Sequence, residues 1–287
     1  MGVFVSYPQY YKGSVPPRLI GGYDNLNDRY REVGINDWGF MYTVGHTECI
    51  GLGCIPTNIP WTKIGYNPSV GTTEELIWVV GGAYVWPSSS MGMEIISTSG
   101  DDDVAGTGVQ KVQLYYLDDD YVEHSEIIET DGTTAVPTAA NDIYRIQSFR
   151  AYQIGSGGVA AGTISIRHLD DTPIYSQIAA NYTRARNMTY TVPAGYYLYL
   201  TSITASVYGA NQGVRITTRA THDPLRPTEI LTFFMPYTEI ALTNGYAYRP
   251  LEIPSKFPEG VRIMVTGISD QDGAIVSVAL RGWLEPA

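Results

Sequence analysis

The residues of this chain best suited to metal chemistry lie within one short segment. The stretch GHTECIGLGC contains His46, Cys49 and Cys54, and imidazole and thiolate are good zinc ligands. Zinc modules usually supply paired Cys-x2-Cys or His-x3-His spacings, which this segment lacks. The spacing therefore favours free thiols in a packed segment, with zinc binding as the alternative. No cofactor is predicted.

Acidic runs are the second set of candidate ligands. Asp101, Asp102 and Asp103 form one run, residues 118–120 form another, and residues 269–273 hold a third. Neighbouring carboxylates repel one another unless a hard cation or solvent relieves them, and calcium uses such oxygens. None of the runs has the twelve-residue loop closed by a glutamate. We interpret them as solvated turns, with calcium binding as the alternative.

Catalytic signatures are missing from the sequence. There is no nucleophile elbow, phosphate-binding loop or metalloprotease helix motif. His124 and His168 lie beside acidic residues, as expected by chance in an acidic chain. A glycosidase needs only two carboxylates at a set separation, which a sequence does not display. We predict a non-enzymatic protein, and a glycan-cleaving enzyme remains an alternative.

Composition limits the partners. The formal net charge is −11 and no cluster of cations stands out, which argues against a nucleic-acid surface. No segment has the eighteen or so apolar residues of a membrane span. The start, MGVFVSYPQYYKG, lacks the basic and apolar regions of a signal peptide. With only two cysteines, we expect a chain made in a reducing cytoplasm.

Strand-like alternation dominates the chain from Glu74 onward. Apolar and polar residues alternate with period two in many short segments, and Asn-Gly and Asp-Gly pairs mark turns. The last segment is the clearest, with Val276, Val278 and Leu280 on one face. We predict that residues 73–287 form an all-β domain, an antiparallel β-sandwich with jelly-roll-like topology and almost no helix.

One strand changes its pattern halfway. Leu198 and Leu200 share one parity, whereas Ile203 and Val207 share the other. A shift of one residue moves side chains to the opposite face of a sheet, so we predict a bulge or bend near Thr201.

Residues 1–72 differ in composition from the rest. Prolines and glycines are frequent and the aromatic residues have no regular spacing. One short helical turn is expected over residues 24–33. We predict an extended N-terminal arm or small irregular subdomain that contacts neighbouring molecules through its aromatic side chains, namely Tyr7, Tyr10, Tyr11, Trp38 and Trp61.

A family resemblance appears between roughly residues 110 and 284. A Gly-Ser-Gly-Gly turn at residues 155–158, the strand AGTISIR and the segment YTVPAGYYLYLTS resemble the β-sandwich structural proteins of tailed-phage virions, of the head-decoration (cement) or head-fibre type. The resemblance implies a virion protein that stabilises the capsid head. It would bind capsid or other virion proteins, form a homo-oligomer such as a trimer, and carry no catalytic residues. A receptor- or carbohydrate-binding module of a phage tail or fibre is the alternative.

Overall fold

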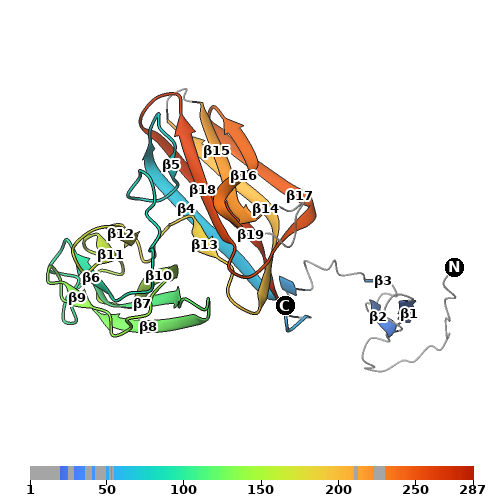
Figure 1. Ribbon diagram of the computed structural model, residues 1–287, viewed down its shortest axis with the longest axis horizontal. Coiled ribbons are helices and arrows are strands. Elements are labelled where there is room, and N and C mark those ends of the chain that lie inside the picture. Colours follow the sequence, from blue (N-terminus) through green and yellow to red (C-terminus); the bar gives the residue numbers. More distant parts are fainter. Residues whose placement is uncertain are drawn as a thin grey trace. The chain divides into compact units, whose positions relative to one another are not determined.

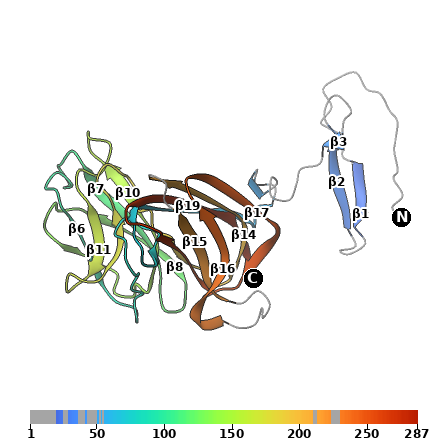
Figure 2. The same ribbon diagram turned by 90° about the horizontal axis from the view of Figure 1, so that it is seen from above.

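The computed structural model of the chain describes residues 20–24, 29–35, 41–42, 50–51, 53, 55–209, 213–222 and 230–287. Every element whose bounds it gives is a β-strand, and every pairing between these strands is antiparallel (Figures 1 and 2). The prediction of an all-β chain is confirmed. The chain divides into two compact units, residues 1–56 and 57–287, which are described separately.

The first unit contains one small sheet. Its strands are β1 (Ile20–Asp24), β2 (Arg29–Ile35) and β3 (Met41–Tyr42), in the order β1-β2-β3. Ile20 lies opposite Val33 in the β1–β2 pair. The helical turn expected over residues 24–33 is therefore wrong where the structure describes this range, because Asp24 ends β1 and residues 29–33 belong to β2, while residues 25–28 lie outside the described residues.

The second unit contains two pairs of sheets, each with its own hydrophobic core. We call the first the inserted pair, because its strands lie between β5 and β13 of the other pair. One of its sheets has the order β12-β11-β6-β9 and the other has the order β10-β7-β8. The strands are β6 (Met93–Ser97), β7 (Val109–Leu117), β8 (Glu123–Glu129), β9 (Val136–Pro137), β10 (Arg145–Ile154), β11 (Ile164–His168) and β12 (Ile174–Ile178).

We call the other two sheets the main pair. Their orders are β17-β14-β19-β4 and β13-β18-β15-β16, and β5 also pairs with β18. The strands are β4 (Ile59–Val70), β5 (Glu75–Leu76), β13 (Thr189–Thr191), β14 (Tyr196–Tyr208), β15 (Val214–His222), β16 (Ile230–Leu242), β17 (Gly245–Phe257), β18 (Arg262–Ser269) and β19 (Ala274–Pro286).

Side-chain alternation determines which faces are buried in the main pair. Val276, Val278 and Leu280 of β19 are buried in its core, as their common parity predicted. In β14, the register shifts between Leu200 and Ser202 against both neighbouring strands. The predicted irregularity at Thr201 is confirmed, and it lets residues of both parities in β14 face the same core.

The N-terminal arm expected over residues 1–72 extends too far along the chain. Residues 59–70 form β4, which pairs with β19 along most of its length. The boundary between the compact units instead follows Pro56. Pro60 and Pro68 suggested an irregular segment, but β4 lies at the edge of its sheet, where proline is tolerated.

Candidate functional site

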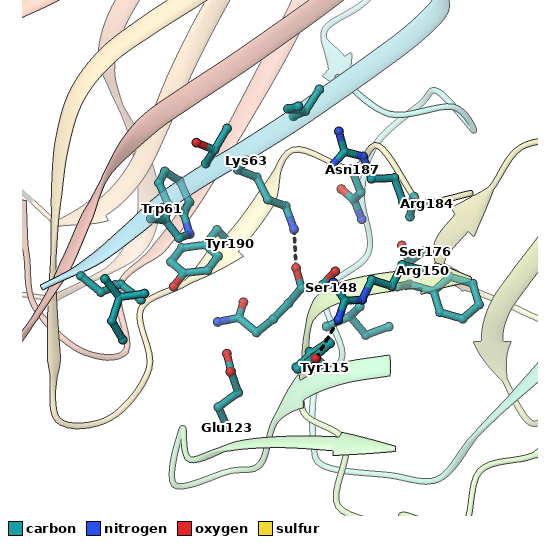
Figure 3. Close-up of a pocket in the computed structure, with 18 of the residues that line it drawn as sticks. Trp61, Lys63, Tyr115, Glu123, Ser148, Arg150, Ser176, Arg184, Asn187 and Tyr190 are labelled. Atoms are coloured by element: carbon teal, nitrogen blue, oxygen red, sulfur yellow. Dashed lines mark hydrogen bonds between the residues drawn. The ribbon is translucent and has the colours of Figure 1, made fainter. Parts of the chain in front are cut away.

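A cleft of about 560 Å³ lies between β4 of the main pair and β10 of the inserted pair (Figure 3). Gln147 joins its two sides. The side-chain amide of Gln147 donates to the carbonyl oxygen of Thr191 at 2.6 Å and accepts from the Thr191 amide at 3.2 Å. Because Gln147 is buried and both polar atoms of its side-chain amide bond to Thr191, it holds β10 against β13 beside the cleft.

Lys63 of β4 extends into this cleft. Its ammonium group donates a hydrogen bond to the backbone oxygen of Gln147 at 2.5 Å. Burial lowers the pKa of Lys63 from 10.5 to about 8, because the charged amine loses water that a single carbonyl replaces only in part. Close to neutral pH, a larger fraction of this amine is therefore uncharged than of an ordinary lysine.

Glu123 and Tyr190 stand at other positions around the cleft (Figure 3). Partial burial of its carboxyl raises the pKa of Glu123, which lies at the exposed rim. Tyr190 is buried, and burial also raises the pKa of its phenol. The ring of Tyr190 packs against Trp61 with centroids 4.7 Å apart. Both tyrosine and tryptophan thus belong to the wall of the cleft.

The charge of the lining is basic although the chain is acidic. Lys63, Arg150 and Arg184 line the cleft together with a single carboxylate, that of Glu123. The guanidinium group of Arg150 is held in place because it donates hydrogen bonds to Oε1 of Gln113 at 2.8 Å and to the hydroxyl of Tyr115 at 2.9 Å. Guanidinium groups fixed in this way suit a carboxylate or another oxyanion. The arrangement can bind an anionic group at the cleft.

A second recess of about 370 Å³ has aromatic walls. Trp86 stacks on Phe234 with ring centroids 5.6 Å apart, and the Tyr84 ring lies edge-on to Trp86 at 5.1 Å. At one side, Arg219 forms an ion pair with Glu74 at 2.6 Å. Burial opposes ionisation of Glu74, but hydrogen bonds from Thr266 and Arg219 keep its pKa below the usual value.

The structure tests only some of the residues singled out in the sequence. His46, Cys49, Cys54, Tyr7, Tyr10, Tyr11 and Trp38 lie outside the described residues. Trp61 lies in β4, within the second unit, and packs on Tyr190 instead of belonging to an arm. A contact between Trp61 and a neighbouring molecule stays a prediction.

The first acidic run is not a solvated turn throughout. Asp101 is exposed and Asp103 is half-buried, but Asp102 is fully buried. The carboxylate of Asp102 accepts four hydrogen bonds, from the Ser97 hydroxyl and from the amides of residues 109, 161 and 162, at 2.6–2.9 Å. The four donors leave no place for a cation, so Asp102 is a structural anion that joins three chain segments.

The second acidic run contributes to a cluster that the sequence did not indicate. Ligand atoms of Asp118, His124 and Asp142 all lie within 4.8 Å of one another. Asp142 is far from the run in sequence and has no neighbouring histidine or cysteine, so local spacing gave no signal for it. The third run, residues 269–273, forms a turn in which Asp272 accepts from the amide of Thr72 at 3.0 Å.

An exposed apolar edge is formed by β16 and β17. These two strands are the last in their respective sheets. They carry large apolar side chains that face water, with Ile253 83 % exposed, Tyr246 67 % and Phe233 61 %. Single exposed apolar residues are common, but here several lie on two consecutive edge strands.

Comparisons with family models, with curated proteins and with solved structures find no match for this chain. Within the described residues, no helix is long and apolar enough to span a membrane.

Proposed function

We propose that this protein is a non-enzymatic structural protein of a tailed-phage virion, of the head-decoration type. In this proposal, the β16–β17 edge contacts a neighbouring virion protein. The observation that carries the proposal is the exposed apolar side chains on these two strands. The sequence resemblance over residues 110–284 supplies the class of assembly.

The finer fold that we propose for the main pair is a jelly-roll sandwich. Apart from the short β5, the main pair has eight strands whose pairings are nested in sequence. The first strand pairs with the last and each following pair lies inside the one before: β4 with β19, β13 with β18, β14 with β17, and β15 with β16. Such nesting results when one long hairpin wraps into two facing sheets. Jelly rolls of this kind are common in viral capsid and lectin domains, which supports a role in assembly or binding.

Proline limits how the edge can make contact. Pro236 lies in β16, and Pro250 and Pro254 lie in β17. A proline has no amide proton, so it interrupts the hydrogen-bonding edge that another strand would need. The exposed side chains, rather than strand addition, are therefore expected to carry the contact. Such an interface depends on particular side chains, and the proline residues hinder the addition of further strands to the sheet edge.

The proposal is tested with Ile253→Asp and Ile127→Asp. Both isoleucines are exposed on strands, but Ile127 lies on β8 of the inserted pair. We expect Ile253→Asp to abolish sedimentation with the heads of the phage that encodes the protein, while Ile127→Asp sediments as the parent does. Circular dichroism verifies that both variants fold. Equal sedimentation of both variants with heads would overturn the proposal, and so would a parent protein that never sediments with them.

The arm and the oligomer complete the proposal. We expect residues 1–56 to contribute further contacts and the assembled form to be a trimer. Sedimentation equilibrium of the full chain measures its oligomeric state. The same measurement on a chain lacking residues 1–30 shows whether the arm contributes to that oligomer. A stable monomer at the concentration found on virions would contradict the trimer.

A second candidate function is favoured by the aromatic recess. Trp86, Phe234 and Tyr84 present ring surfaces beside the Glu74–Arg219 pair, and sugar rings are bound by such combinations of aromatic faces and fixed polar groups. This arrangement fits the receptor- or carbohydrate-binding alternative. Glycan-array binding that is lost in Trp86→Ala, with capsid binding unchanged, would support it.

A further inference from the structure

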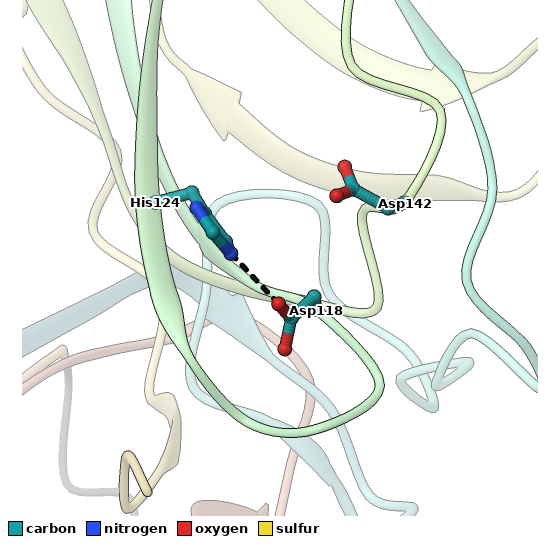
Figure 4. Close-up of side chains that lie close together, drawn as sticks. All are labelled: Asp118, His124 and Asp142. Carbon is teal, nitrogen blue, oxygen red and sulfur yellow. Dashed lines mark hydrogen bonds and ion pairs between the residues drawn. The ribbon is translucent and has the colours of Figure 1, made fainter.

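Three potential ligands from separate parts of the inserted pair converge at one point (Figure 4). Asp118 follows the end of β7, His124 lies in β8, and Asp142 lies shortly before β10. Their nearest ligand atoms lie within 4.8 Å of one another. In Figure 4 the imidazole of His124 points toward Asp118, and Asp142 extends toward the same place from the neighbouring loop.

Each aspartate is oriented by a second group that does not belong to the cluster. One carboxylate oxygen of Asp118 accepts from the amides of Asp120 and Val122 at 3.0 and 2.9 Å. Its other oxygen therefore faces Nε2 of His124, 2.7 Å away. The Tyr116 hydroxyl donates to Oδ1 of Asp142 at 3.2 Å. Metal sites commonly orient their ligands by such outer hydrogen bonds.

The chemistry of the set suits a divalent transition-metal ion. Two carboxylates and one neutral imidazole carry a net charge of −2, which a divalent cation neutralises. Zinc accepts these ligands at about 2.0–2.2 Å, and water can fill its remaining position. A simple His–Asp ion pair would account for Asp118 and His124, but it gives no role to Asp142.

We propose that Asp118, His124 and Asp142 bind a zinc-class divalent metal ion with water completing the coordination. The ion would fix the turn between β7 and β8. The backbone oxygen of Tyr121 in this turn accepts from the Ala194 amide of the main pair at 2.8 Å. Metal binding would therefore strengthen the connection between the two sheet pairs, a role distinct from that of the β16–β17 edge.

The test uses the full chain carrying Cys49→Ser and Cys54→Ser, which removes both thiolates of the other candidate zinc site and leaves only His46 of that set. After chelator treatment and dialysis, titration calorimetry measures binding of Zn²⁺, and the visible spectrum of bound Co²⁺ reports its coordination. We expect one ion per chain and a rise in melting temperature. A Co²⁺ spectrum without thiolate-to-metal charge-transfer bands would agree with oxygen and nitrogen ligands.

Matched variants identify the ligands. Asp142→Asn keeps the shape of the side chain and should abolish binding, as should His124→Gln. Tyr116→Phe removes only the outer hydrogen bond and should weaken binding about tenfold or more. His168→Gln is the control, because His168 also lies beside an aspartate, Asp170, at 3.5 Å, outside the cluster. Circular dichroism verifies the fold of each variant.

The outcomes separate the proposal from the ion-pair interpretation. Loss of binding in Asp142→Asn and His124→Gln, but not in His168→Gln, supports the site. Failure of the cysteine-free chain to bind Zn²⁺ would overturn it. Binding that persists unchanged in Asp142→Asn would also overturn it, because an ion pair between His124 and Asp118 does not need Asp142.

Discussion

At the scale of the residue, Asp102 is the clearest case of a side chain whose environment differs from that of its neighbours. Asp101 and Asp103 reach solvent, whereas Asp102 is enclosed and accepts hydrogen bonds from three backbone amides and one hydroxyl. A buried carboxylate needs hydrogen bonds, an opposite charge or a metal ion to replace its lost water, and here the four hydrogen bonds supply that replacement. The run of three aspartates in the sequence gave no indication of which one would be buried.

We predict that Asp102→Asn lowers the free energy of unfolding by about 3 kcal/mol, since a hydrogen bond to a charged group contributes about 1.5–3 kcal/mol and unsatisfied buried groups add to the loss. The new amide NH₂ would face backbone N–H donors at one of the two oxygen positions. Denaturant unfolding measures the change. The exposed neighbour gives the control, Asp101→Asn, which should stay within about 0.5 kcal/mol of the parent.

Lys63 gives a prediction about pH. Its folded pKa, about 8, lies below the ordinary value of 10.5. Below pH 8 both states hold the proton, and the folded state bears the cost of the buried charge. Between pH 8 and 10.5 the unfolded state binds more protons, so stability contributed by Lys63 rises with pH in this window.

The measurement is an NMR titration of ¹³C-methylated lysines. The chain has four lysines, Lys12, Lys63, Lys111 and Lys256. One resonance should titrate near pH 8 and should disappear in Lys63→Arg. Four resonances that all titrate above pH 10 would contradict the burial of this amine.

At the scale of the element, β14 and β19 show how much a strand pattern can reveal. The parity of Val276, Val278 and Leu280 and the shift near Thr201 were both visible in the sequence, because side chains alternate strictly along a strand. The position of β4 was not visible. Its two prolines are compatible with a strand only at a sheet edge, and a sequence does not show which strand lies at an edge.

Gly282 lies opposite the irregularity of β14. Its register partner is Leu200, and a Cβ atom on Gly282 would clash with the carbonyl oxygen of Tyr199. We predict that Gly282→Ala lowers the free energy of unfolding by about 1–3 kcal/mol, as overpacking typically does. Thermal melting measures it.

Gly100→Ala is the control for this substitution, because a Cβ atom there would meet nothing within 4 Å. It should leave stability unchanged or raise it by up to about 1 kcal/mol through the unfolded state. If the Gly282→Ala protein melted at the same temperature as the Gly100→Ala protein, β14 and β19 would separate easily at this point.

At the scale of the whole molecule, the second unit has two cores where the sequence predicted one sandwich. Period-two alternation is the same in the inserted pair and the main pair, so it shows that strands exist but not which of them share a core. The cleft at Lys63 was unpredictable for the same reason. Its residues come from β4, β7, β8, β10, β12, β13 and β19 and from the segment before β13, and only the packing of the two pairs brings them together.

Truncation tests the boundary of the second unit. We predict that a chain beginning at Thr57 folds with both cores intact, because it retains β4 and all later strands. A chain beginning at Thr73 lacks β4 and leaves one hydrogen-bonding edge of β19 without its partner, so it should aggregate or melt at a much lower temperature. Circular dichroism and size-exclusion chromatography compare the two. Equal melting temperatures would place β4 outside the folded body.

The pairing of β4 with β19 also dictates an order of events during synthesis. β4 leaves the ribosome early, but its partner β19 is made after β5–β18, so β4 waits until residues 274–286 have emerged. Every strand of the inserted pair is complete once Ile178 has emerged, and this pair can close its core while the main pair is unfinished. A chain that stops within β19 would therefore combine a folded inserted pair with exposed, aggregation-prone strands of the main pair, because β4 would lack the strand that covers its edge.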